Sequence, residues 1–152
     1  MGLDMYLNAT RYISHYDYSD TAKKEKALGE QIVRLIGGAP GPLKYVAVEA
    51  MYWRKANQIH AWFVRNVQNG EDECREHDVS RDDLDKLRQA CRDVLANRER
   101  AADVLPAQSG FFFGSTCYDD DYFNDLESTA EQIDALLDPK WEEWSFTYRS
   151  SW

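Results

Sequence analysis

The chain has 152 residues, of which 43% are hydrophobic and 30% charged, and its formal net charge is −9 at pH 7. These values are typical of a globular domain with its own core and exclude a disordered chain. The acidic excess repels phosphate backbones, which excludes general binding of DNA or RNA through a basic face. The acidic charge is compatible with mimicry of nucleic acid toward a basic partner, and also with a role in solubility alone.

No signal for export or membrane insertion is visible. The start, Met1–Leu7, lacks the basic region and apolar run of a signal peptide, and no segment approaches the length of a membrane span. Cys74, Cys91 and Cys117 are too few and too widely spaced to indicate a disulfide framework. We therefore expect a cytoplasmic protein.

The first third of the chain predicts a strand, a helix and a loop. Residues 3–14 alternate apolar and polar side chains, which predicts a strand. Ser19 or Asp20 is a typical helix cap, and 37–38 (Gly-Gly) a typical helix end. The apolar stripe of this helix is Leu28, Ile32, Leu35 and Ile36. The prolines within 39–42, Pro40 and Pro42, predict a loop.

The middle of the chain predicts a second strand over 43–53, rich in Val and aromatic residues. A helix is predicted to follow, because Ala56, Ile59, His60, Phe63 and Val67 recur at helical spacing. Asn69-Gly70 is predicted to stop that helix in a left-handed conformation.

The last half of the chain predicts two helices and two extended segments. The capping box at 80–83 opens a helix through about Arg98, and Asp119 to Asp138 forms the last helix. The stretch Gly110–Ser115 (GFFFGS) predicts a short strand with Phe111 and Phe113 on one face and Phe112 on the other. Residues 141–152 predict a final strand with Trp144, Phe146 and Tyr148 on one face.

Together these elements predict an α+β fold. We expect a single domain over residues 1–152, with a small, mostly antiparallel sheet packed with about four helices.

The junction between the second strand and its helix is a candidate anion site. A helix N-terminus offers free N–H groups, to which Arg54 and Lys55 would add charge-assisted hydrogen bonds. Tyr52 and Trp53 would supply stacking faces. In the alternative interpretation, Trp53 packs in the core and the two cations face water.

Two further segments carry candidate ligand-binding residues. In GFFFGST the rings of Phe111 and Phe113 would form walls, and Ser115 and Thr116 would donate hydrogen bonds; the alternative is a buried strand between turns. Near the end of the chain, Arg149 could hold a phosphate or carboxylate beside Trp152. In the alternative, Trp152 only anchors the terminus. No P-loop or dinucleotide motif is present.

Evidence for catalysis or metal binding is weak. His60 is expected to be a packed, hydrogen-bonded core residue, and Cys74 with His77 lacks the second pair that a zinc site needs. Asp119–Asp121 is explained by helix capping. An enzyme would have to depend on His60 or His77, with Asp4 as a partner. We therefore expect no catalytic residue, no metal and no cofactor.

Four segments carry a resemblance to a known group: 1–7 (MGLDMYL), 52–70 (YWRKANQIHAWFVRNVQNG), 105–126 (LPAQSGFFFGSTCYDDDYFNDL) and 148–152 (YRSSW). Together they resemble a family of small phage and prophage proteins, with the main break over about 12–44. The family has no settled biochemical role, so the resemblance implies a setting, the cytoplasm of an infected bacterium. In that setting, small phage proteins often counteract host defence.

The leading hypothesis is a phage-type protein that sequesters a nucleotide-derived host immune signal, cyclic oligonucleotide or ADP-ribose-like, without catalysis. Its expected ligand-binding residues are Tyr52, Trp53, Arg54, Lys55, Phe111, Phe113, Ser115, Thr116, Arg149 and Trp152. The alternative is an acidic inhibitor of a host defence nuclease or effector, which would use the runs 69–78 and 119–127 as a nucleic-acid mimic. A homo-oligomer, at least a dimer, is expected in addition.

Overall fold

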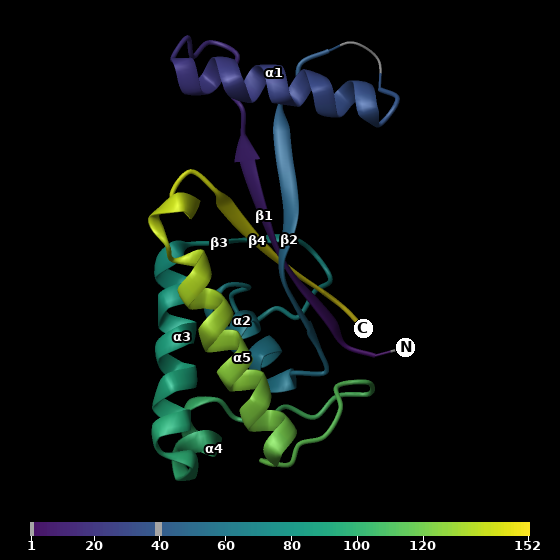
Figure 1. The fold of residues 1–152 in the computed structure, drawn as a ribbon. Helices are drawn as coiled ribbons and strands as arrows, with labels where there is room; N and C mark the ends of the chain where they lie inside the picture. The colour runs from purple at the N-terminus through teal and green to yellow at the C-terminus, as the bar shows by residue number, and fades with distance from the viewer. Residues whose placement is uncertain (1, 39–40) are drawn as a thin grey trace. The chain divides into compact units, whose positions relative to one another are not determined.

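The computed structural model describes residues 2–38 and 41–152, and over these residues it confirms the α+β class. The loop predicted at Pro40 and the first residue, Met1, lie outside the described residues. Five α-helices and four strands follow one another in the described chain (Figure 1). Their order is β1 (Asp4–Tyr12), α1 (Asp20–Leu35), β2 (Tyr45–Arg54), α2 (Asn57–Asn66), β3 (His77–Val79), α3 (Arg81–Ala96), α4 (Ala101–Val104), α5 (Asp120–Leu136) and β4 (Ser145–Ser151).

The chain divides into two compact units. The larger unit comprises Met1–Ala9 and Glu49–Trp152, and the smaller unit comprises Thr10–Val48. The larger unit contains the hydrophobic core and the candidate sites described below.

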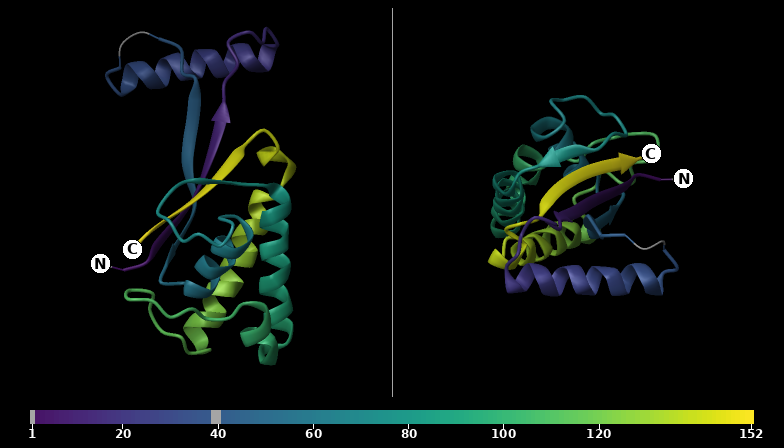
Figure 2. Two further views of the ribbon diagram at one scale, coloured as in Figure 1. Left: turned by 180° about the vertical axis from the view of Figure 1, so that it is seen from behind. Right: turned by 90° about the horizontal axis from the view of Figure 1, so that it is seen from above.

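The sheet has the strand order β2-β1-β4-β3, so β1 pairs with β2 on one side and with β4 on the other. Alternate residues of β1, among them Met5 and Leu7, are buried, as are Phe146 and Tyr148 of β4. The buried side chains of α2, α3 and α5 belong to the same core, and α3 and α5 lie side by side in both views of the larger unit (Figures 1 and 2). One face of the sheet is therefore covered by helices.

The predicted helix starts are confirmed by their caps. The Ser19 hydroxyl accepts a hydrogen bond from the Ala22 N–H, and the Asp119 carboxylate accepts one from the Tyr122 N–H. At α3, Ser80 and Asp83 form both bonds of the capping box. These short polar side chains satisfy N–H groups that no helical partner can reach, and so set where each helix begins.

The segment Gly110–Ser115 is a turn, so the prediction of a strand there is wrong. The N–H of Phe113 donates to the carbonyl of Gly110 at 3.3 Å, which closes a tight turn around Phe111 and Phe112. The predicted alternation of faces fails with it, because Phe113 is buried and Phe111 is 89% exposed although both were expected on one face. The three-residue strand β3, which pairs antiparallel with β4, was not predicted.

The smaller unit has little core of its own. Helix α1 buries only Ala22 and Gly29 within the described chain. The predicted apolar stripe of this helix is exposed, from 38% at Ile32 to 86% at Leu35.

Candidate functional site

The loop over residues 105–117 is held in place by one buried side chain at the start of α2. Asn57 is 1% exposed, and its amide nitrogen donates to the carbonyls of Phe113 (3.1 Å) and Ser115 (2.8 Å). Its amide oxygen accepts from the N–H of Gln108 at 2.8 Å. One buried amide group therefore holds the backbone of the loop on both sides of the turn.

The residue that directly follows β2, Lys55, has a left-handed conformation and contacts a left-handed glycine of this loop, Gly114. Lys55 has φ of +62° and Gly114 has φ of +92°. A Cβ at Gly114 would lie 3.0 Å from Cβ of Lys55, so only glycine fits there without displacement. The backbone of Lys55 is fixed on both sides, because its N–H donates to Leu3 and its carbonyl accepts from Asn57, each at 2.8 Å. A non-glycine residue in this conformation is uncommon and occurs frequently at functional sites.

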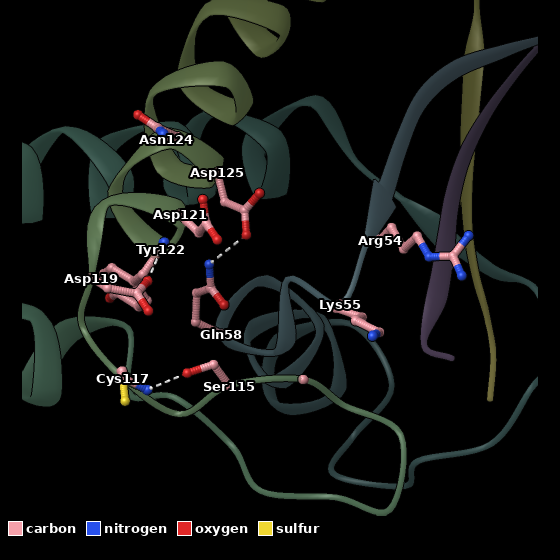
Figure 3. Close-up of a pocket in the computed structure, with 11 residues that line it drawn as sticks. Arg54, Lys55, Gln58, Ser115, Cys117, Asp119, Asp121, Tyr122, Asn124 and Asp125 are labelled. Atoms are coloured by element: carbon pink, nitrogen blue, oxygen red, sulfur yellow. Dashed lines mark hydrogen bonds between the residues drawn. The ribbon is translucent and has the colours of Figure 1, made fainter. Parts of the chain in front are cut away.

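A polar pocket of about 370 Å³ lies between this junction and the start of α5 (Figure 3). Its walls come from the end of β2, from α2, from the loop over residues 105–117 and from the first turns of α5. It is lined by Arg54, Lys55, Gln58, Gly114, Ser115, Cys117, Asp119, Asp121, Tyr122, Asn124 and Asp125.

The polar pocket has a basic end and an acidic end. In Figure 3, Asp119, Asp121 and Asp125 gather on the α5 side, and Arg54 and Lys55 lie on the β2 side with their charged groups turned away from the carboxylates. Both cationic side chains run past Gly2, where a Cβ would lie 3.4 Å from Cε of Lys55 and 4.0 Å from Nη2 of Arg54. The charges of the two ends are therefore separated.

Burial changes the acid–base properties of the acidic end. Desolvation raises the pKa of Asp125 above its ordinary value of 3.8, and the hydrogen bond from the Gln58 amide opposes this rise. Near the basic end, the hydroxyl of Tyr52 donates to Asp4, and this bond raises the pKa of Tyr52. The pocket thus offers carboxylates that accept hydrogen bonds at one end and cations at the other.

A second pocket, of about 300 Å³, lies on the aromatic part of the same loop. It is lined by Asp72, Gln108, Ser109, Gly110, Phe111, Phe112, Phe113 and Trp152. The rings of Phe111 and Phe112 are 4.5 Å apart and inclined at 77°, and those of Phe113 and Trp152 are 6.2 Å apart and inclined at 68°. We call this the aromatic pocket and the first one the polar pocket.

Asp72, which lines the aromatic pocket, contacts both the last residue of the chain and a buried histidine. Its carboxylate accepts a hydrogen bond from the indole N–H of Trp152 at 3.2 Å. Nε2 of His60 lies 3.1 Å from the other carboxylate oxygen, a close polar contact that does not have the geometry of a hydrogen bond. On the far side of the ring, Nδ1 of His60 lies 2.7 Å from the hydroxyl of Tyr148.

His60 and Tyr148 are both fully buried, and burial raises the pKa of Tyr148 well above its ordinary value. The expectation that His60 is a packed, hydrogen-bonded core residue is therefore confirmed. The partner suggested for it, Asp4, instead accepts a hydrogen bond from Tyr52, and the carboxylate beside His60 is Asp72.

The ten predicted binding residues do not converge on one pocket. Arg54, Lys55 and Ser115 line the polar pocket, whereas Phe111, Phe113 and Trp152 line the aromatic pocket. The remaining four residues line neither pocket; they are Tyr52, Trp53, Thr116 and Arg149.

These four residues have other surroundings. Trp53 packs in the core, where its indole N–H donates to Thr129 at 2.8 Å, so the alternative interpretation of this residue holds. Tyr52 is half exposed and its ring lies 5.5 Å from that of Tyr6. Thr116 and Arg149 are exposed.

Sequence reasoning missed the residues that pin the loop and form the acidic end. Asn57 and Gln58 were treated only as part of a helix, and Asp119 and Asp121 as helix-capping residues or as part of an acidic surface, never as the lining of a pocket. Capping is confirmed for Asp119, but both carboxylates also line the polar pocket. One signal was present in the sequence, since Asn57, Gln58 and His60 are the polar residues of an otherwise apolar stretch from Ala56 to Val64.

No set of three or more His, Cys, Asp or Glu side chains suited to a metal ion occurs in the described part of the chain. Within the same residues, no helix combines the length and the apolar character needed to cross a membrane. Comparisons of the chain with protein-family models, with curated proteins and with solved structures found no match.

Proposed function

We propose that this chain is a non-catalytic binding protein whose polar pocket takes a nucleotide-derived small molecule with one or two phosphates. The observation that carries the proposal is the separation of a basic end, Arg54 and Lys55, from an acidic end within one pocket. A ligand that fits such a pocket carries negative charge at one end and hydrogen-bond donors at the other.

A nucleotide has this distribution of groups. Its phosphate would accept charge-assisted hydrogen bonds from Arg54 and Lys55. The ribose hydroxyls and the amino groups of a base are donors that the carboxylates at the α5 end would accept. The acidic end and the net charge of −9 oppose ligands with more phosphates, because each added negative charge raises the cost of binding.

The loop supports binding rather than turnover. Asn57 fixes the backbone from Gln108 to Ser115, so little conformational entropy is lost when a ligand binds. His60 is fully buried and lines neither pocket. The resemblance to phage proteins supports a role in sequestering such a molecule during infection, with the host immune signal as the proposed ligand.

Isothermal titration calorimetry with adenosine, cyclic AMP, a cyclic dinucleotide, ADP-ribose and ATP tests the proposal. We expect binding to the ligands with one or two phosphates and weaker binding to ATP. Lys55→Gln is expected to weaken binding about tenfold, the value of one charge-assisted hydrogen bond. Lys140→Gln, at an exposed lysine outside the pocket, is the matched control.

A second pair of variants tests the acidic end. Asp121→Asn removes a charge from the pocket, and Asp103→Asn removes one from an exposed position outside it. Only the first is expected to change the ranking of the ligands, by improving the binding of ATP. No heat and no thermal shift with any member of the panel would refute the proposal.

Self-association remains a prediction. The exposed stripe of α1 is the place to test it, because Leu35 is 86% and Ile36 75% exposed. Light scattering is expected to give the mass of at least a dimer, and Leu35→Asp to lower that mass. A monomer mass for the unaltered protein would overturn the prediction.

A further inference from the structure

We infer that the aromatic pocket is a binding site for a quaternary ammonium group, distinct from the nucleotide site proposed above. The pocket combines four aromatic side chains with one charged residue, Asp72, and contains neither lysine nor arginine. This composition differs from that of the polar pocket, so the inference stands on separate observations.

The charge of the pocket decides between a cation and an anion. The faces of aromatic rings carry partial negative charge and attract cations within about 6 Å of the ring centre. Asp72 adds a carboxylate, and the whole chain has a net charge of −9. An anionic ligand here would meet ring faces and a carboxylate without any cation to bind it.

The ring geometry suits a compact cation. The two neighbouring pairs, Phe111 with Phe112 and Phe113 with Trp152, are both close to perpendicular. Rings in different orientations therefore border one small volume, as in the aromatic cages that bind methylated ammonium groups. Phe111 is 89% and Trp152 52% exposed, so a ligand would cover ring surface that the core does not use.

The contacts of Asp72 favour a quaternary ammonium over a primary amine or a guanidinium. One carboxylate oxygen already accepts from the indole of Trp152, and the other lies 3.1 Å from Nε2 of His60. A trimethylammonium group has no N–H to donate, so it gains the attraction of the carboxylate without requiring another lone pair. A primary amine or a guanidinium carries three or more N–H groups, whereas Asp72 is the one carboxylate among the described residues that line this pocket, and part of its accepting capacity is already used by Trp152.

The backbone of the cage is held in place. The carbonyl of Phe112 accepts from the N–H of Leu3 at 3.2 Å, and that of Phe113 accepts from Asn57 at 3.1 Å. Binding therefore requires little rearrangement beyond the exposed rings.

The test uses tetramethylammonium chloride and choline, with NMR chemical shifts of the Trp152 indole N–H and the amides of Gly110 to Phe113 as the readout. Sodium chloride controls for salt. The neutral isostere 3,3-dimethyl-1-butanol, which has carbon in place of the charged nitrogen, controls for shape. We expect both cations to shift these signals and choline to bind at least about tenfold more tightly than the isostere.

Phe111→Ala is expected to weaken choline binding about threefold or more, and it should fold normally because the ring is exposed. Tyr16→Ala, at a ring that is 84% exposed outside the pocket, should leave binding unchanged. Asp72→Asn should reduce the preference for choline over the isostere. The affinities for choline and for a trimethyl-lysine amide are also compared. Tighter binding of choline would indicate a free metabolite as the source of the quaternary ammonium group, and tighter binding of the amide would indicate a modified lysine side chain.

Equal binding of choline and its neutral isostere would overturn the inference, as would shifts that sodium chloride reproduces. Unchanged affinity in Phe111→Ala would overturn it too. None of these results bears on nucleotide binding, which is measured with different ligands and variants.

Discussion

Replacement of Asn57 by alanine tests whether this side chain organises both pockets. The substitution removes three hydrogen bonds to the loop while leaving the core side chains in place. At about 1 kcal/mol net for each bond, the loss is about 3 kcal/mol. Alanine has a higher helix propensity than asparagine at the start of α2, which stabilises the variant by roughly 0.6 kcal/mol. The expected net loss of stability is therefore about 2.4 kcal/mol.

In a chain of about this length, 1 kcal/mol corresponds to roughly 2–4 °C in Tm, so the Asn57→Ala variant should melt about 5–10 °C lower. Differential scanning calorimetry measures this shift. Hydrogen exchange should in addition show faster exchange at Gln108, whose N–H donates to Asn57. Asn66→Ala is the matched control, because Asn66 is exposed and its side chain donates only to the carbonyl of Trp62, one turn earlier.

Asn57→Asp separates hydrogen bonding from packing. The aspartate has almost the same shape, but it places a carboxylate oxygen against the carbonyls of Phe113 and Ser115 in place of the donating nitrogen. We expect at least as large a loss as for alanine, because two acceptors would then face each other in a buried place. A Tm within about 1 °C of the unaltered protein for both variants would refute the reasoning.

Three further predictions concern single residues of the larger unit. Gly114→Ala should lower stability by about 1–2 kcal/mol in thermal denaturation, because its φ of +92° is unfavourable for alanine. Asp125→Asn should raise Tm at pH 7, and this gain should shrink as the pH falls toward 3.8. The reason is that the pKa of Asp125 is raised in the folded state, so the folded protein binds this proton more tightly than the unfolded chain does. The stability of the unaltered protein therefore decreases as the pH rises through this range. Thermal melts of both proteins from pH 3.5 to 7 measure this, and a difference that grows toward acid would contradict the assignment. Titration with a thiol reagent should label Cys74 and Cys117 in the native protein and Cys91 only after unfolding, since burial raises the pKa of Cys91 to about 12; rapid labelling of all three would show that the core opens.

The helix caps were predictable because they depend on a few neighbouring residues. Ser19, Ser80 and Asp119 each bond an N–H within three residues, so a local pattern contains the whole interaction. Strand faces were predictable for the same reason in β1 and β4, where alternation places the apolar residues on the buried side. The alternation of β2 also places Trp53 on the inner face with Met51, and this signal could have identified Trp53 as a core residue.

The turn at Phe111–Phe113 and the two pockets were not predictable in this way. Three consecutive aromatic residues favour a strand by local propensity, but the turn depends on Asn57 and Leu3, which lie more than fifty residues away in sequence. Arg54, Lys55 and Ser115 line one pocket, and their charge and hydroxyl chemistry are visible in the sequence. The acidic residues opposite them come from α5, and only the packing of the chain brings these groups together.

The strand order has a consequence for how the protein folds. Because β1 pairs with β4, the first strand of the sheet cannot gain its second neighbour until the last strand has been synthesised. Until then only the pairing of β1 with β2 is available, and the apolar inner side of β1, with Met5 and Leu7, has no complete core to join. Such long-range pairing is slow and leaves an unpaired strand edge during folding. A chain shortened before Ser145 should therefore aggregate, whereas a fragment that binds at this edge should rescue it.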